Sequence, residues 1–245
     1  MFFTNYPRTL YNFGTENSAT AIQNISVYVD VIDQIKDNIN FYEFIEIGDG
    51  ERPDTISQEL YGTVRYYWTL YLLNDNIRER GWPLTSQQIR ARGIIDYPNT
   101  VLTTRNINTL LTHFQVGDTV AGQSSGATGV VLKRNLDLGQ IFVKVTNNLT
   151  FSGNEVLRDN TDPAFPENVT LVGAVKEYDA IHHYVDGDGV ITDVDPYSTP
   201  SALLTAVTYL DRYQAANDEL RRIKVIKRTA INQVAKAYQE ALRTT

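Results

Sequence analysis

Residues 41–76 constrain the fold more than any other part of the chain, because they order one strand and two helices within a short stretch. The sequence FYEFIEI at 41–47 mixes aromatic and β-branched residues with acidic ones, as a half-exposed strand does. The turn sequence GDGERP follows it. Helical apolar spacing then predicts one helix that ends at Tyr61, stopped by Gly62, and a second helix over about 64–73. The segment therefore predicts a strand–helix–helix core.

The ends of these helices are also predicted from residue type. Thr55 is expected to cap the first helix, with Gln58 three residues later completing a capping box. Asn74 is expected to end the second helix, because asparagine tolerates the left-handed conformation that a helix stop needs.

The order strand, helix, helix resembles a LysM module, which usually binds cell-wall glycan. We expect Trp68 to lie buried between the helices and the strand, with Tyr61 and Leu72 against it. A LysM module adds a second strand soon after, but GWPLTSQQIRARG follows here, so the closing strand must come from elsewhere. In the strand-like RRIKVIK, Ile223 and Val225 share a face that would complete the sheet. The residues that carry the LysM-like motif are Arg52, Pro53, Tyr61, Gly62, Trp68, Leu72 and Asn74.

A second region, residues 113–175, has the pattern of an all-β unit. Alternating runs are separated by turns rich in glycine, serine and asparagine. The sequences FQVGDTVAG and SGATG resemble small β-barrel inserts of phage virion proteins, and FSGNEVL looks like a degenerate second copy. We therefore expect a separate small β-barrel here.

Together these patterns predict an α+β fold. Its LysM-like βαα core is completed by a carboxy-terminal strand and helices, and the small all-β barrel-like domain is inserted into it. The expected division is an extended amino-terminal arm at 1–40, the LysM-like core at 41–112, the inserted β domain at 113–175, and a hairpin and carboxy-terminal helical segment at 176–245 that packs on the core.

Charge is unevenly distributed along the chain. The net charge is −7, yet residues 205–245 carry +4, and five of their cations fall within RRIKVIKR. A basic tail on an acidic body favours docking on an acidic surface, nucleic-acid contact, or a salt-bridged face of the chain's own fold. The tail has few aromatics for base stacking, which argues against nucleic acid. The chain has no cysteine, no long apolar run and no charged-then-apolar leader, so we expect manufacture in a reducing cytoplasm.

The sequence YVDGDGVITDVD raises the question of a calcium loop. In that register Tyr184 occupies the first ligand position and Asp195 the last, so the first carboxylate is missing and the last is short. A hairpin turn around DGDG explains the same residues without a metal. Four residues match EF-hand positions: Asp186, Asp188, Gly189 and Ile191.

No catalytic, cofactor-binding or metal-binding site is predicted. The three histidines are His113, His182 and His183, and adjacent strand residues point to opposite faces, so the last two are not expected to hold one ion. GQSSGATG lacks the lysine of a phosphate-binding loop.

Two separated segments resemble one family, the LysM-like baseplate wedge protein (wedge protein 53) of T4-like contractile-tailed bacteriophages. The first segment is RPDTISQELYG with YYWTLYLLNDN and GWPLTSQQ, and the second is AVTYLDRYQAANDELRRIKVIK. The opening NYPRTLYNF is also similar, while the segment at 113–175 departs from shorter members.

The resemblance implies a non-enzymatic structural subunit that clamps neighbouring wedges together in a sixfold tail baseplate. Its implied partners are other wedge subunits and the sheath-like initiator protein, with no membrane, nucleic acid or small-molecule substrate. Its implied location is the virion, after assembly in the host cytoplasm. The alternative is a peptidoglycan-binding LysM module of a wall-associated protein. The candidate protein-interaction residues are Asn217, Arg221, Arg222, Ile223 and Tyr238.

Overall fold

The computed structural model describes residues 7–12, 14, 19–24, 36, 38–161 and 167–244. The chain forms two compact units, and one of the two points at which it passes between them falls inside a helix. The first unit comprises residues 1–85 and 216–245, and the second comprises residues 86–215. Within the described residues no helix is long and apolar enough to cross a membrane.

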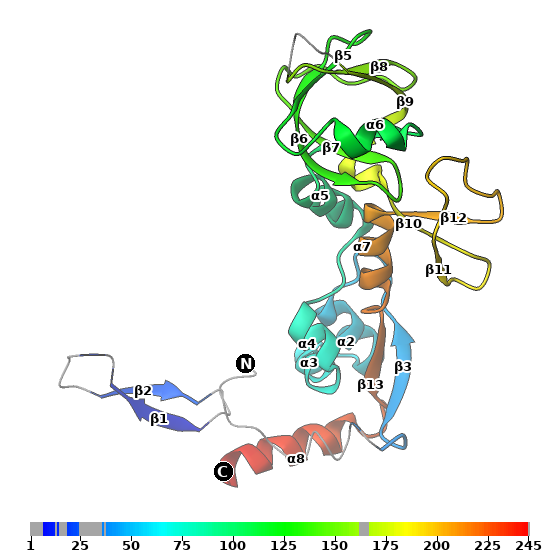
Figure 1. Ribbon diagram of the computed structural model, residues 1–245. Helices are drawn as coiled ribbons and strands as arrows, with labels where there is room; N and C mark the ends of the chain where they lie inside the picture. Colours follow the sequence, from blue (N-terminus) through cyan, green and yellow to red (C-terminus); the bar gives the residue numbers. More distant parts are fainter. Residues whose placement is uncertain are drawn as a thin grey trace. The chain divides into compact units, whose positions relative to one another are not determined.

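The first unit contains mixed α and β structure (Figure 1). A short hairpin pairs β1 with β2, so part of the expected amino-terminal arm is paired. Residues 1–6, 13, 15–18, 25–35 and 37 of the arm lie outside the described residues. The elements of this unit are β1 (Arg8–Tyr11), β2 (Thr20–Gln23), β3 (Tyr42–Glu46), α2 (Pro53–Tyr61), η2 (Val64–Tyr66), α3 (Trp68–Leu73), α4 (Asp75–Arg80), β13 (Arg222–Ile226) and α8 (Ile231–Thr244).

The carboxy-terminal strand closes the sheet of this unit, as predicted. β13 runs antiparallel to β3, with Ile223 opposite Ile45. Ile223 and Val225 are fully buried and pack with residues of the helices, among them Ile56 and Leu70. The strand that the amino-terminal half lacks therefore comes from the other end of the chain.

The helices differ from three of the expectations. The second helix, expected over about 64–73, is the 3-10 turn η2 followed by α3, which begins at Trp68. α2 begins at Pro53, two residues before the expected cap Thr55, because proline at the first helical position has no N–H to satisfy. Gly62 ends the helix with φ 74°, as predicted. Asn74 is extended, with φ −123°, rather than left-handed. Its side chain donates to the carbonyl of Leu70 and accepts from the N–H of Lys224, so Asn74 ties α3 to β13.

Trp68 is buried, but its main partner is the last helix. Its ring stacks on Tyr238 with centroids 5.0 Å apart, and Leu72 packs against the same cluster. The expected contact with Tyr61 is wrong, because Tyr61 lies in a neighbouring cluster and donates its hydroxyl to the Ile226 carbonyl. The apolar face of α8 thus covers α3 and the end of α2.

The second unit contains a closed six-stranded barrel (Figure 1). Its elements are α5 (Ser86–Asp96), β4 (Thr100–Thr104), α6 (Ile107–Thr112), β5 (Thr119–Gly122), β6 (Thr128–Asn135), β7 (Gln140–Val145), β8 (Val156–Asp159), β9 (Asn168–Lys176), η3 (Glu177–Asp179), β10 (Ile181–Val185), β11 (Ile191–Thr192), β12 (Thr205–Thr208) and α7 (Tyr209–Asp218), the last of which continues into the first unit. The barrel order is β4-β7-β6-β5-β8-β9. α6 places Ile107 and Leu110 in the barrel core.

The barrel begins earlier than the expected boundary at 113. β4 lies between β7 and β9, so residues 100–104, placed in the 41–112 segment by the sequence, complete the ring. β4 is buried at four of its five positions, so it lacks the alternation that marked the other strands. The division into units at 86 and 215 likewise differs from the expected one.

The suspected second copy of the barrel turn is confirmed by its geometry. Phe114 and Phe151 both enter the barrel core. The residue after each donates its N–H to a carboxylate three positions on, Asp118 in the first turn and Glu155 in the second. Gly117 and Asn154 occupy the equivalent left-handed position.

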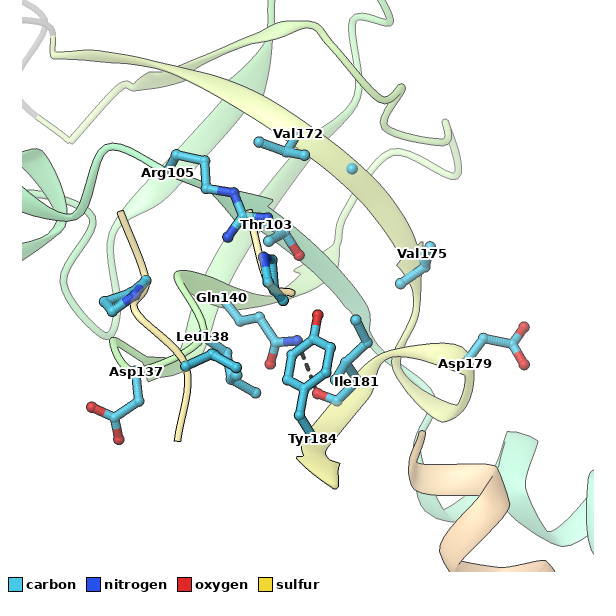
Figure 2. A pocket seen from close by; sticks show the side chains of 14 residues that line it. Thr103, Arg105, Asp137, Leu138, Gln140, Val172, Val175, Asp179, Ile181 and Tyr184 are labelled. Atoms are coloured by element: carbon cyan, nitrogen blue, oxygen red, sulfur yellow. Dashed lines mark hydrogen bonds between the residues drawn. The ribbon is translucent and has the colours of Figure 1, made fainter. Parts of the chain in front are cut away.

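A pocket of about 290 Å3 lies beside the barrel, where β4 and β9 meet β10 and the segment after β11 (Figure 2). Its walls include Leu138, Val172 and Ile181.

Candidate protein-interaction site

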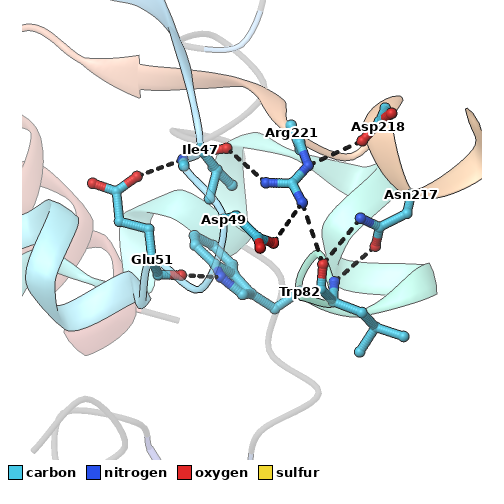
Figure 3. Close-up of polar contacts among 9 residues, drawn as sticks. Ile47, Asp49, Glu51, Trp82, Asn217, Asp218 and Arg221 are labelled. Carbon is cyan, nitrogen blue, oxygen red and sulfur yellow. Dashed lines mark hydrogen bonds and ion pairs between the residues drawn. The ribbon is translucent and has the colours of Figure 1, made fainter. Parts of the chain in front are cut away.

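Arg221 lies at the centre of a polar network that fixes the loop after β3 (Figure 3). Its guanidinium pairs with Asp49 at 3.0 Å and Asp218 at 3.1 Å, and donates to the carbonyl of Ile47 at 3.2 Å. The side chain is only 12% exposed. A planar guanidinium with several fixed acceptors joins the start of β13 to the end of β3.

Asn217 and Trp82 complete this network. Asn217 accepts from the N–H of Leu84 at 2.7 Å and donates to its carbonyl at 3.1 Å. The indole N–H of Trp82 donates to the carbonyl of Glu51 at 2.7 Å. The carboxylate of Glu51 in turn accepts from the N–H of Gly48. The loop 48–52 is therefore held from both sides by residues of its own unit.

Four of the five candidate interaction residues have their side chains inside the first unit. Ile223 and Tyr238 are buried, Asn217 is 7% exposed, and Arg221 is engaged as described. Arg221, a candidate interaction residue, is surrounded by two carboxylates and two carbonyls of the same unit. Only Arg222 points outward. Because neighbouring residues alternate in direction, the side chains of Arg221 and Arg222 lie on opposite sides of the sheet.

The outward side of the sheet carries aromatic rings stacked with cations. The guanidinium of Arg222 lies 4.8 Å from the ring centroid of Phe44, and the ammonium of Lys224 lies 4.6 Å from that of Tyr42. Phe44 is 49% exposed. Aromatic residues and arginine are enriched in protein interfaces. We call this surface the aromatic–cation face, which consists of Tyr42, Phe44, Glu46, Arg222 and Lys224.

The same sheet leaves one edge of β3 unpaired among the described residues. The N–H of Ile47 donates to the carbonyl of Arg221, and the N–H of Lys227 donates to the carbonyl of Phe41. These bonds show which residues of β3 form hydrogen-bonded pairs with β13 and which do not. The backbone groups of Tyr42, Phe44 and Glu46 therefore point away from β13. An exposed strand edge can pair with another chain.

Ionisable groups next to this sheet have shifted pKa values. A hydrogen bond from Lys36 holds the pKa of the Asp75 carboxyl below its usual range, against a smaller opposing effect of burial, and Arg78 and Lys224 add to the lowering. Burial raises the pKa of Tyr61 to about 12, so its hydroxyl stays a donor to the Ile226 carbonyl. These groups stay in one protonation state through the neutral range.

Several other sequence features have structural roles. Asp186 accepts from the N–H groups of Asp188 and Val190, and Gly189 has φ 79°, so DGDG forms the predicted turn between β10 and β11. No group of three or more His, Asp or Glu side chains in the described ranges is arranged to hold a metal ion.

The expectation that the side chains of His182 and His183 point to opposite faces of the strand is wrong. Their Nδ1 atoms lie 2.9 Å apart, because the β10–β12 ladder shifts register between Ile181 and His183. Nε2 of His182 contacts Arg212 at 2.7 Å. Burial, followed by Arg212 and His183, lowers the pKa of His182. The pair is therefore part of the packing around α7.

One motif was missed. Residues 122–126, GQSSG, have the spacing G-x-S-x-G of a nucleophile turn. The structure places them in the connection between strands β5 and β6, where the motif serine, Ser124, donates its backbone N–H to the Glu155 carboxylate at 3.2 Å. A nucleophile turn instead joins a strand to a helix and needs a histidine base. The motif is therefore part of a structural turn.

Comparison with known families identifies the amino-terminal part of the chain. Residues 1–103 match the family model of base plate wedge protein 53, which covers the β3–α4 region and its preceding residues. No curated protein matches the chain. The barrel after β4 and the closing strand β13 lie outside the matched residues. Residues 1–103 are therefore similar to phage base plate wedge protein 53, and this similarity supports a structural role in the virion tail baseplate.

Proposed function

We propose that the first unit is a LysM-like docking unit that clamps neighbouring wedge subunits together while the baseplate assembles. The observation that carries the proposal is the sheet of β3 and β13, which buries one face in its own core and leaves the aromatic–cation face and one strand edge open. A rigid sheet with an open edge suits repeated contact with identical neighbours.

The internal network of Arg221 and Asn217 supports this role indirectly. It fixes β13 against the loop 48–52, so the exposed side chains of Phe44 and Arg222 are held in place before a partner arrives. Preorganised side chains lose less conformational freedom on binding. The proposed role needs no catalysis.

The proposed partners are the other wedge subunits and the sheath-like initiator protein, in a sixfold ring. A partner that contacts the face would place an acidic or aromatic side chain against Arg222 and would extend the sheet at the edge of β3.

An assembly assay with purified wedge subunits of the same phage tests the proposal. The double variant Phe44→Asp/Arg222→Glu should keep the circular dichroism spectrum and melting temperature of the native protein but fail to enter wedge complexes on size-exclusion chromatography. Lys144→Glu, on the exposed side of the barrel, is the matched charge-reversal control and should assemble normally. Normal assembly of the folded double variant would refute the proposed face.

Glycan binding is the competing outcome. Purified chain should not sediment with purified peptidoglycan. Sedimentation that chitin oligomers compete away, and that Phe44→Asp leaves unchanged, would instead assign a wall-binding role to the LysM-like unit.

A further inference from the structure

The pocket beside the barrel contains a buried hydrogen-bond acceptor without a partner. Gln140, at the start of β7, is 2% exposed and lines the pocket. Its Nε2 donates to the carbonyl of Ile181 at 2.9 Å, which fixes the orientation of the amide (Figure 2). Its Oε1 has no hydrogen-bond partner among the described residues. An unpaired buried carbonyl oxygen is costly, so this position favours a ligand that brings an N–H donor.

A cation lies in the same pocket without an internal partner. Arg105, just after β4, lines the pocket and forms no hydrogen bond or ion pair with another residue of the described chain. Figure 2 shows its side chain extending toward Thr103. A guanidinium offers a carboxylate two parallel donors.

The walls are mostly apolar and continue beyond the pocket. Leu138, Ile181, Pro196 and Pro200 line it, and the half-exposed side chains of Val172 and Val175 extend the apolar surface along β9. β9 pairs with β4 along one edge, and β8 pairs with it only over Asn168–Thr170. The side chains of Val172 and Val175 line the pocket, so a ligand in it contacts these side chains.

Two carboxylates on the rim limit the charge of the ligand. Asp137 and Asp179 also line the pocket, and in Figure 2 both point away from its centre. The two carboxylates disfavour a ligand with several negative charges, while Arg105 favours a ligand with a single negative charge.

We propose that this pocket binds an extended peptide segment of a partner protein, with an apolar residue on either side of a single acidic residue. A backbone N–H of the segment donates to Oε1 of Gln140, and its carboxylate pairs with Arg105. The apolar side chains pack on Leu138, Val172 and Val175. Apart from Thr103, the pocket lies outside the residues matched by the wedge family, so it is a second site, independent of the aromatic–cation face.

The test is an NMR titration of the full-length chain with the peptide Ac-Ser-Leu-Glu-Val-Ser-amide. The side-chain amide signals of Gln140 and the Nε–H signal of Arg105 should shift. The same peptide with Gln in place of Glu should bind about fivefold more weakly, because the charge-assisted pair is lost. A peptide with three consecutive Glu should also bind more weakly than the first.

Variants distinguish binding in the pocket from non-specific charge attraction. Arg105→Met should remove the difference between the Glu and Gln peptides, whereas Lys144→Met should retain it. Val175→Trp, at a half-exposed position, should weaken the binding of both peptides, because the larger side chain narrows the pocket.

The proposal would be overturned by several results. One is the absence of shifts at Gln140 and Arg105. Another is equal affinity for the Glu and Gln peptides. If sodium acetate alone shifts the two signals as strongly as the peptide, the pocket binds a small free carboxylate and the peptide assignment is wrong.

Discussion

The barrel of the second unit takes its six strands from one continuous stretch of chain, whereas the sheet of the first unit joins Ile45 to Ile223. A closed barrel leaves no strand edge, because each strand has two neighbours. The two-stranded sheet leaves edges and must close a long loop before its core forms. The comparison suggests that the barrel is self-sufficient, while the first unit depends on its distant strand and retains an edge that a partner can use.

Truncation after Ala215 should break this comparison most strongly. It removes β13 and α8, so β3 loses its only described partner strand and Trp68 loses Tyr238. The first unit should unfold, while the barrel remains folded. Both tryptophans, Trp68 and Trp82, lie in the first unit, so tryptophan fluorescence reports on that unit and barrel NMR signals report on the other.

The reciprocal deletion is the control. Replacing residues 86–215 with a short Gly/Ser linker should leave the first unit folded, because the hydrogen bonds between Leu84 and Asn217 already hold the two ends together. Replacing only residues 113–175 would instead leave β4 without its neighbours. Loss of the native fluorescence in the 86–215 deletion would show that the first unit depends on the barrel.

Trp68→Ala should destabilise the first unit by about 3–5 kcal/mol, because it leaves a cavity against α8. The remaining Trp82 reports unfolding in a urea titration. Tyr67→Ala is the matched control, since Tyr67 is an exposed neighbour, and it should cost less than about 1 kcal/mol. Similar losses for the two variants would contradict the packing of Trp68 on α8.

Gly139→Ala should destabilise the barrel by about 2–4 kcal/mol, from left-handed strain and overpacking together. Gly139 has φ 61°, and an added Cβ would meet the backbone oxygen of Thr104. Gly173→Ala, in the same barrel with open space around it, should have little effect on the melting temperature. Tryptophan fluorescence of the first unit should stay native in both variants.

The two neighbouring arginines allow a comparison between a side chain bound inside the first unit, Arg221, and one on its exposed face, Arg222. Arg221→Ala should lower the free energy of unfolding by about 1.5–3 kcal/mol, because several charge-assisted hydrogen bonds are lost. Arg222→Ala should change it by less than about 1 kcal/mol, the value of an exposed cation–π contact. Urea titrations give both values. Equal losses would show that Arg222 also holds the fold.

The smallest expected effect is the acid sensitivity of the barrel turns. Burial would raise the pKa of the Glu155 carboxyl, but N–H and hydroxyl donors from Ser125, Ser152 and Ser124 outweigh it and lower the pKa below the ordinary 4.5. A lowered folded-state pKa contributes stability above the unfolded value, and this is lost as pH falls through the folded value. Barrel melting temperature should therefore decline below about pH 4.5, and Glu155→Gln should flatten that decline. An unchanged pH profile would remove Glu155 from the acid response.

Local patterns in the sequence were enough for much of the fold. The helix stop at Gly62, the apolar face of α8, the DGDG turn and the paired barrel turns all depend on residues close together in the chain. The strand character of RRIKVIK was also visible, and the LysM-like order left a place for it. The family resemblance was confirmed over residues 1–103.

Tertiary structure decided which residues face a partner and which hold the fold. Arg221 and Arg222 are neighbours of the same residue type, but strand alternation directs the side chain of Arg221 toward Asp49 and that of Arg222 onto the ring of Phe44. The register shift that brings His182 to His183 and the closure of the barrel by β4 likewise depend on pairing between distant strands. The sequence by itself predicted α2, α8, the turns and the likeness to a baseplate wedge protein, because these follow from local spacing and motif, whereas α4, α5 and α6 were not predicted. The exposed face, the unpaired Gln140 oxygen and the inward turn of Arg221 follow from long-range packing, which no local pattern encodes.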